Sequence, residues 1–147
     1  MSRQARNGES ERALVVRNFY EAVSTGDADA VRALVRERFA DDATLTWPDS
    51  LPYGGTVAGK ARLERVLGRA AGSVELVGVQ KLRLVDLIDG GDRVAAQLEF
   101  DWYAPNGTGS LPGTGAIEVW TFTGDFVHEI KAYYWDTAAC AALPGSS

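Results

Sequence analysis

The spacing of apolar residues changes once along the chain, near residue 74, and this change limits the folds that the chain can adopt. Before it, apolar residues recur three and four positions apart in residues 10–25, in a short segment after Asp27, and in residues 59–71, which is the spacing of amphipathic helices. After it, polar and apolar residues alternate, as in half-buried strands, over residues 74–88, 93–103, 116–122 and 126–135. A brief additional strand is expected at 41–47, before Pro48.

This order of elements predicts an α+β fold. We expect a cone-shaped, curved and mostly antiparallel sheet with three helices of the N-terminal half packed on its concave face, enclosing an apolar pocket. Residues 1–9 are expected to be a disordered extension, residues 10–136 a single domain and residues 137–147 a tail with one helical turn. The segment 104–115 contains four glycines and two prolines, so it is expected to form a flexible loop or a lid.

Composition excludes several classes of function. The 147 residues carry a net charge of −5 without a cluster of Lys and Arg, which argues against a nucleic-acid or membrane partner. One cysteine and one histidine exclude an internal disulfide and the usual zinc site. No dinucleotide or phosphate-loop motif is present, and the polar N-terminus lacks the apolar core of a secretory signal. These features predict a cytoplasmic protein without a metal or cofactor.

The strand "GAIEVWTF" (residues 115–122) carries a carboxylate on its aromatic face. Alternation places Glu118 on the same side as Trp120 and Phe122. An ionised carboxylate buried without a partner costs several kcal/mol, so the group is expected to stay neutral. A neutral Glu118 can donate a hydrogen bond or act as a general acid. Alternatively, Glu118 pairs with a basic residue across the sheet, or the strand is reversed and Glu118 faces water.

Four stretches of the chain resemble the nuclear transport factor 2-like superfamily: "VVRNFYEAVSTGDADAVRALVRERFADDATLTWPDS", "YGGTVAGKARLERVL", "IEVWTF" and "EIKAYYW". The resemblance covers residues 11–136. This superfamily includes ketosteroid isomerase, scytalone dehydratase, limonene epoxide hydrolase and the SnoaL-like polyketide cyclases. The resemblance implies an α+β cone with a deep apolar pocket, a homodimer and no cofactor.

Comparison with the ketosteroid isomerases assigns three positions. Their general base corresponds to Trp47, their oxyanion-hole tyrosine to Phe19, and their protonated aspartic acid to Glu118, so one position of three keeps an acid. This pattern argues against steroid isomerase chemistry. Tyr20, next to Phe19, is the alternative that could reach the pocket in its place.

The resemblance also indicates which strand faces point inward. In the last strand it directs His128, Ile130, Ala132 and Tyr134 inward; by the same alternation Ala96, Leu98, Phe100 and Trp102 line the interior, while Gln97, Glu99 and Asp101 face outward, where relatives dimerise. Trp47 is either a flat pocket wall or a core residue. Asp49 is an alternative base or a turn former, and Tyr53 is a donor at the pocket mouth or a loop residue. His128 is a candidate acid–base group or a solvent-exposed residue.

These observations favour a cofactor-free cyclase or isomerase for a hydrophobic polyketide-like or polyene intermediate, with ring closure by an aldol-type reaction or an intramolecular cycloaddition. The predicted catalytic residues are Glu118, Asp49 and His128. The predicted substrate-binding residues are Phe19, Tyr20, Trp47, Tyr53, Leu98, Phe100, Trp102, Trp120 and Tyr134. One alternative is a non-catalytic small-molecule-binding or dimerisation module. The other, a dehydratase or epoxide hydrolase, requires more His, Asp or Arg groups than this chain places in the cone.

Overall fold

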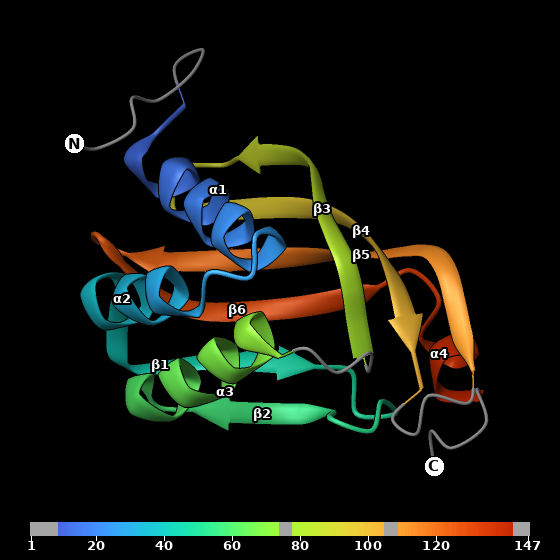
Figure 1. The fold of residues 1–147 in the computed structure, drawn as a ribbon. Helices are drawn as coiled ribbons and strands as arrows, with labels where there is room; N and C mark the ends of the chain where they lie inside the picture. Colours follow the sequence, from blue (N-terminus) through green and yellow to red (C-terminus); the bar gives the residue numbers. More distant parts are fainter. Residues whose placement is uncertain (1–8, 74–77, 105–108, 143–147) are drawn as a thin grey trace.

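The computed structural model describes residues 9–73, 78–104 and 109–142, which form helices over one face of a curved sheet (Figure 1). The described helices are α1 (Glu11–Ser24), α2 (Ala28–Arg38), α3 (Lys60–Gly72) and α4 (Thr137–Ala142). The described strands are β1 (Phe39–Trp47), β2 (Gly55–Ala58), β3 (Gly78–Asp89), β4 (Arg93–Tyr103), β5 (Ser110–Thr123) and β6 (Phe126–Tyr134).

The first two helices begin at the residues that the sequence indicates, and the first ends just before Gly26. The Ser10 side chain accepts a hydrogen bond from the backbone N–H of Ala13, and the Asp27 side chain accepts one from Ala30. Each cap satisfies a donor at the helix N-terminus that has no partner within the helix. Gly26 has a φ of +71°, a left-handed conformation that favours glycine, so the chain turns there between α1 and α2.

The strands form one six-stranded sheet in the order β2-β1-β6-β5-β4-β3. Every neighbouring pair is antiparallel except β1 and β6, which are parallel. The sheet curves without closing, and α1, α2 and α3 cover one of its faces (Figure 1). The predicted α+β architecture is therefore confirmed.

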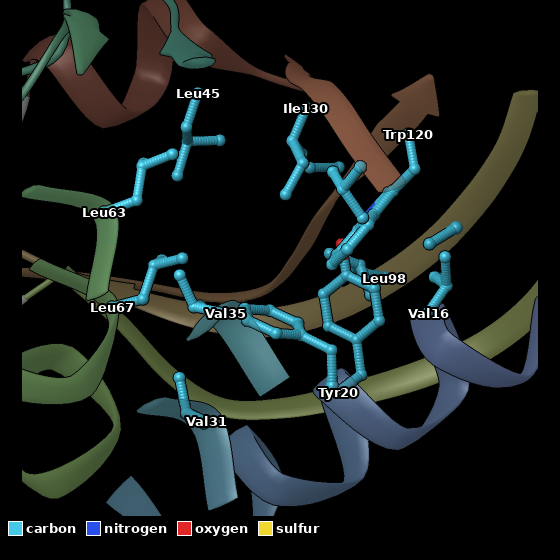
Figure 2. Close-up of a cluster of buried hydrophobic side chains, with 14 of the residues drawn as sticks. Val16, Tyr20, Val31, Val35, Leu45, Leu63, Leu67, Leu98, Trp120 and Ile130 are labelled. Atoms are coloured by element: carbon cyan, nitrogen blue, oxygen red, sulfur yellow. The ribbon is translucent and has the colours of Figure 1, made fainter. Parts of the chain in front are cut away.

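The core lies between the helices and the concave face of the sheet. In β4, alternate residues from Val94 to Trp102 are buried, as the alternation in sequence predicts. Figure 2 shows Val16 and Tyr20 of α1, Val31 and Val35 of α2, and Leu63 and Leu67 of α3 facing Leu45, Leu98, Trp120 and Ile130 of the sheet. The side chains of the helices and of the curved sheet fill the space between the two layers only in part.

The prediction of a flexible loop or a lid at 104–115 is wrong for residues 110–115. Residues 110–115 belong to β5 and pair with β4. Pro112 and Gly113 lie opposite Asp101 alone, and the Gly113 N–H donates to the Asp101 carboxylate at 2.9 Å. This β-bulge interrupts the alternation of the strand, which is why the segment looks like a loop in sequence. Residues 105–108 of the expected lid lie outside the described part.

Strand β2 was not predicted. Its four residues follow the turn-rich stretch before Gly55 and pair with the end of β1, Trp47 lying opposite Gly55. Four residues are too few to display an alternating pattern, so only the pairing partner reveals the strand.

The two ends of the chain lie partly outside the described residues. The disorder expected at 1–9 concerns residues 1–8, which are not described, whereas Glu9 pairs with Arg17 at 2.7 Å. The helical turn expected in the tail is α4, and it buries Cys140 in the core. Residues 143–147 of the tail are not described.

Replacing Leu63 with alanine is expected to lower the free energy of unfolding by about 2–5 kcal/mol. Leu63 is fully buried on the inner face of α3, so its truncation removes apolar contacts and leaves a cavity. Urea denaturation measures the change. The control is Arg62→Ala, at an exposed position on the same helix, which is expected to change stability by less than about 0.5 kcal/mol; equal effects of both changes would contradict this account of the core.

Candidate functional site

A cavity of about 430 Å³ lies between the helices and the sheet. Its mouth is formed by the ends of α1 and α3 and the start of β3, and its inner walls are formed by the sheet. Figure 2 shows Leu45, Leu67 and Ile130 around this space. Seven predicted site residues line it: Phe19, Tyr20, Trp47, Leu98, Phe100, Glu118 and Tyr134.

Glu118 is one of only two charged residues among the described lining residues, and the other, Lys81, is at the mouth. Its carboxylate accepts a short hydrogen bond from the Tyr20 hydroxyl, which in turn accepts one from the Trp120 N–H at 2.8 Å. Burial raises the pKa of Glu118, and the hydrogen bond from Tyr20 opposes this increase only in part. The paired arrangement with a basic residue, considered above, is not found among the described residues.

The hydrogen bonds around Tyr20 determine where a proton on Glu118 resides. An indole N–H can only donate, so the Trp120 contact makes the Tyr20 oxygen an acceptor there and directs the Tyr20 proton to Oε1 of Glu118. Oε2 has no hydrogen-bond partner among the described residues. It is also not one of their fully buried polar atoms that lack a partner, so it is accessible. When Glu118 is neutral, its proton is therefore on Oε2, where it can meet a molecule in the cavity.

A second group of the same kind lies farther along the sheet. The Trp102 N–H donates to the Tyr53 hydroxyl at 3.1 Å, and the Tyr53 and Tyr134 hydroxyls form a short hydrogen bond. Burial raises the pKa of Tyr53 to about 12 and holds that of Tyr134 well above its usual range. Both phenols are consequently neutral near pH 7 and can act as hydrogen-bond donors.

Three of the predicted substrate-binding residues do not line the cavity. Trp102 and Trp120 are fully buried, and each is linked through its N–H to a tyrosine hydroxyl, so they support Tyr53 and Tyr20 from behind. Tyr53 packs edge-on against Trp47, with ring centroids 5.4 Å apart, and supports Tyr134. The sequence placed Trp102 and Trp120 on the correct face of the sheet, but strand alternation does not reveal which residues lie beneath others.

The inward orientation predicted for His128 is wrong. Thr121 pairs with Glu129 and Phe122 with Val127, so His128 is the extra residue of a β-bulge and has no partner on β5. The bulge reverses the alternation, with the result that Val127 is buried and His128 is half-exposed, 3.9 Å from Asp42. Neither His128 nor Asp49 lines the cavity: Asp49 is exposed in the turn after Pro48, and the turn-former alternative describes its position.

The assignment of the helix tyrosine also needs correction. The resemblance placed Phe19 at the position of the oxyanion-hole tyrosine, but the hydroxyl that reaches Glu118 belongs to Tyr20. Phe19 packs edge-on against the Trp120 ring, with centroids 5.0 Å apart. Adjacent helical residues differ by about 100° in direction, so a displacement of one residue replaces an apolar wall with a donor.

Sequence reasoning missed the residues at the mouth of the cavity. They are Val23, Ser24, Thr25 and Gly26 at the end of α1, Leu67, Ala70, Ala71 and Ser73 at the end of α3, and Val79, Gln80, Lys81 and Leu82 of β3. Inside the cavity Leu45 was also missed, whereas Ile130 was predicted to point inward. The amino group of Lys81 lies 3.8 Å from the Asp101 carboxylate. No motif marks these residues, because their proximity depends on where two helices end above a strand.

The described residues contain no group of three or more His, Cys, Asp or Glu side chains placed to hold a metal ion. None of the helices in the described ranges is both long and apolar enough to span a membrane.

The raised pKa of Glu118 predicts a specific pH dependence of stability. Between the ordinary pKa of 4.5 and the raised value, the folded protein retains a proton that the unfolded chain has lost, so the free energy of unfolding falls as pH rises through this window. Each pKa unit between the two states corresponds to about 1.4 kcal/mol. Glu118→Gln is expected to abolish this fall and to be more stable than wild type above the window.

Urea denaturation between about pH 4 and about pH 8 measures this effect. The matched control is Glu37→Gln, at an exposed position on α2, which is expected to keep the wild-type profile. A Glu118→Gln protein with the wild-type pH profile would show that folding does not raise the pKa of Glu118.

Solved structures with the same fold include proteins with little characterised function. The chain is similar to Bal32a from a soil-derived mobile gene cassette (24% identity, 87% of this chain and 92% of that one, TM-score 0.69). It is also similar to a protein with a ketosteroid isomerase-like fold from Catenulispora acidiphila in complex with trimethylamine (15% identity, 90% and 95%, TM-score 0.64). A third is TerC co-crystallised with polyporic acid (17% identity, 88% and 95%, TM-score 0.66).

Among curated proteins, none matches this chain. The model of the SnoaL-like domain matches residues 16–133, a range that includes every helix and strand bordering the cavity except the start of α1 and the last residue of β6. This fold is of the small-molecule-binding or isomerase and cyclase type. The chain has the fold of nuclear transport factor 2-like proteins, and it belongs to the SnoaL-like domain family.

Proposed function

We propose that the protein is a cofactor-free cyclase or isomerase that acts on a hydrophobic polyketide-like or polyene intermediate in this cavity. The observation that carries the proposal is Glu118: a half-buried carboxyl group at the inner sheet face, without an ion-pair partner among the described residues, and with Oε2 free of hydrogen bonds from them. Phe19, Trp47 and Phe100 provide apolar walls for a conjugated substrate.

One carboxyl group suffices for a mass-neutral ring closure. As a carboxylate, Glu118 takes a proton from the carbon next to a substrate carbonyl, and the resulting enolate attacks a second carbonyl of the same molecule. The protonated Glu118 then returns the proton to the new alkoxide oxygen, so no atom is gained or lost. A raised pKa makes the carboxylate a stronger base in the first step. If ring closure is a cycloaddition, neutral Glu118 instead donates a hydrogen bond to the reacting carbonyl.

The fixed position of the carboxyl supports this role. The Tyr20 hydroxyl of α1 donates a hydrogen bond to Oε1. Trp120 restrains Tyr20 by a hydrogen bond and by edge-on packing of the two rings, whose centroids are 5.8 Å apart. A reacting group held in one orientation avoids the entropy loss of ordering it during the reaction. Relatives by fold co-crystallised with polyporic acid and trimethylamine are consistent with small organic molecules as ligands of such folds.

The alternative functions differ in what they require from the cavity. A dehydratase or epoxide hydrolase needs several acid–base groups, whereas Glu118 and Lys81 are the charged residues among the described lining residues. A non-catalytic binding module needs the apolar walls but not the proton on Glu118. The behaviour of a variant that keeps the shape and loses the proton therefore separates the binding module from the enzyme.

We expect Glu118→Gln to reduce turnover by at least about 10²-fold while ligand affinity changes by less than about threefold. The substrates to test are linear polyketide-like and polyene compounds, and mass spectrometry and chromatography detect a cyclised isomer of unchanged mass. Glu37→Gln is the control, with the wild-type rate expected. Conversion at the uncatalysed rate in wild type would remove the enzyme proposal, and tight binding without conversion would favour the binding module.

We also propose that the protein forms a homodimer through the outer face of the sheet. A surface groove there is bordered by Gln97, Glu99, Ile117, Tyr133 and Trp135. Trp135 is 85% exposed and Tyr133 is 50% exposed, and aromatic residues of this kind are enriched in protein interfaces. A second copy would cover them.

Trp135→Glu is expected to convert the dimer to a monomer, because the introduced carboxylate would lose hydration in the interface. Sedimentation velocity measures the oligomeric state. Phe126→Glu, at another half-exposed aromatic residue outside this groove, is the control and is expected to remain dimeric. A wild-type protein that sediments as a monomer at its highest soluble concentration would refute the proposed interface.

A further inference from the structure

The direction of the hydrogen bonds at Tyr53 and Tyr134 leaves one proton unassigned. The Trp102 N–H can only donate, so the Tyr53 oxygen accepts from it. Two phenolic oxygens at hydrogen-bond distance share a single proton between them, and the second hydroxyl proton must therefore point elsewhere. Neither hydroxyl has another hydrogen-bond acceptor among the described residues.

The position of the cavity decides which hydroxyl keeps the unshared proton. Tyr134 lines the cavity, whereas Tyr53 does not. If Tyr134 donated to Tyr53, the Tyr53 proton would be left without an acceptor among the described residues, away from the cavity. If Tyr53 donates to Tyr134, the Tyr134 proton is free on the group that borders open space, and every buried donor has a partner or access to a ligand.

Tyr134 is also placed beside Glu118 on the same face of the sheet. Glu118 pairs directly with Ala132, and Tyr134 pairs directly with Ala116. Tyr134 and Glu118 are thus diagonal neighbours on adjacent antiparallel strands, with backbones about 7–8 Å apart. The other diagonal consists of the two alanines.

We infer that the Tyr134 hydroxyl is a second hydrogen-bond donor of the cavity, directed by Trp102 and Tyr53, and that it selects ligands with a carbonyl-type acceptor oxygen on an apolar conjugated skeleton. The Phe100 ring, edge-on to Tyr134 with centroids 5.5 Å apart, holds the phenol in place. This inference rests on the proposed function only in that both use the same cavity. Tyr134 is a binding and specificity residue here, and Glu118 remains the group that exchanges a proton.

The test compares two fluorescent probes of nearly equal shape: a dimethylaminonaphthyl ketone, whose emission moves to longer wavelength when its carbonyl accepts a hydrogen bond, and its analogue with CH₂ in place of the carbonyl. Wild type is expected to bind the ketone about three- to tenfold more tightly, the range of one neutral hydrogen bond. Tyr134→Phe is expected to reduce both the ketone preference and the emission shift, leaving only what Glu118 contributes, without weakening binding of the carbonyl-free probe.

Two further variants keep the inference falsifiable. Tyr133→Phe removes a hydroxyl from the adjacent, half-exposed residue on the outer face, and the ketone preference is expected to persist. Tyr53→Phe leaves the Tyr134 hydroxyl in place but frees it to rotate, so the preference is expected to fall about two- to threefold. In a stably folded Tyr53→Phe protein, an undiminished preference would show that Tyr53 does not direct the donor.

The outcomes separate this inference from the proposed function. An undiminished ketone preference in Tyr134→Phe, equal weakening of both probes in that variant, or no ketone preference in wild type would each overturn the inference, while the Glu118 turnover experiment would be unaffected. Conversely, a reduced preference in Tyr134→Phe supports the inference even if no substrate is converted. In that case only the proposed enzymatic function would be contradicted.

Discussion

The hydrogen bond from Tyr20 to Glu118 is the contact on which the organisation of the cavity depends. It joins α1 to β5 across the interior, and it is the one hydrogen bond that the described residues give to a carboxylate whose burial is unfavourable. Trp120, fully buried behind Tyr20, fixes the direction of this bond. One donor offsets only part of the cost of burying a charge, and the carboxyl therefore keeps a high affinity for a proton.

The two tryptophan–tyrosine pairs have the same hydrogen-bond arrangement, but their tyrosines donate to different groups. Each indole N–H faces a tyrosine oxygen and so directs the tyrosine proton away from the indole. In one pair the proton goes to Glu118, a group whose protonation can change; in the other it goes to Tyr134, whose raised pKa keeps it neutral. The cavity thus has one group suited to proton exchange, Glu118, and one suited to donating a hydrogen bond without changing its charge, Tyr134.

The sequence predicts the fold and much of this site because alternation and helical spacing report which side of an element is buried. Alternation placed Glu118 on the inner, aromatic face of its strand, and alternation together with the family resemblance placed Phe100 and Tyr134 in the interior. The pattern fails where the register between strands changes, as at the bulge of His128, because a bulge is a relation between two strands and leaves no mark in one. It also fails to order residues by depth, so Trp120 was expected in the lining although it lies beneath Tyr20.

The cavity itself is an argument for function. A leucine at position 118 would remove the unfavourable burial of a carboxyl, and larger residues at Ala70 and Ala71 would narrow the mouth; both changes would make the core more like that of a purely structural domain. A chain that instead combines open space, an unpaired carboxyl oxygen and small residues at the entrance departs from optimal packing at one place. Such local departures from the rules of stability concentrate where a protein meets a ligand, which is why the site is better explained by chemistry than by folding.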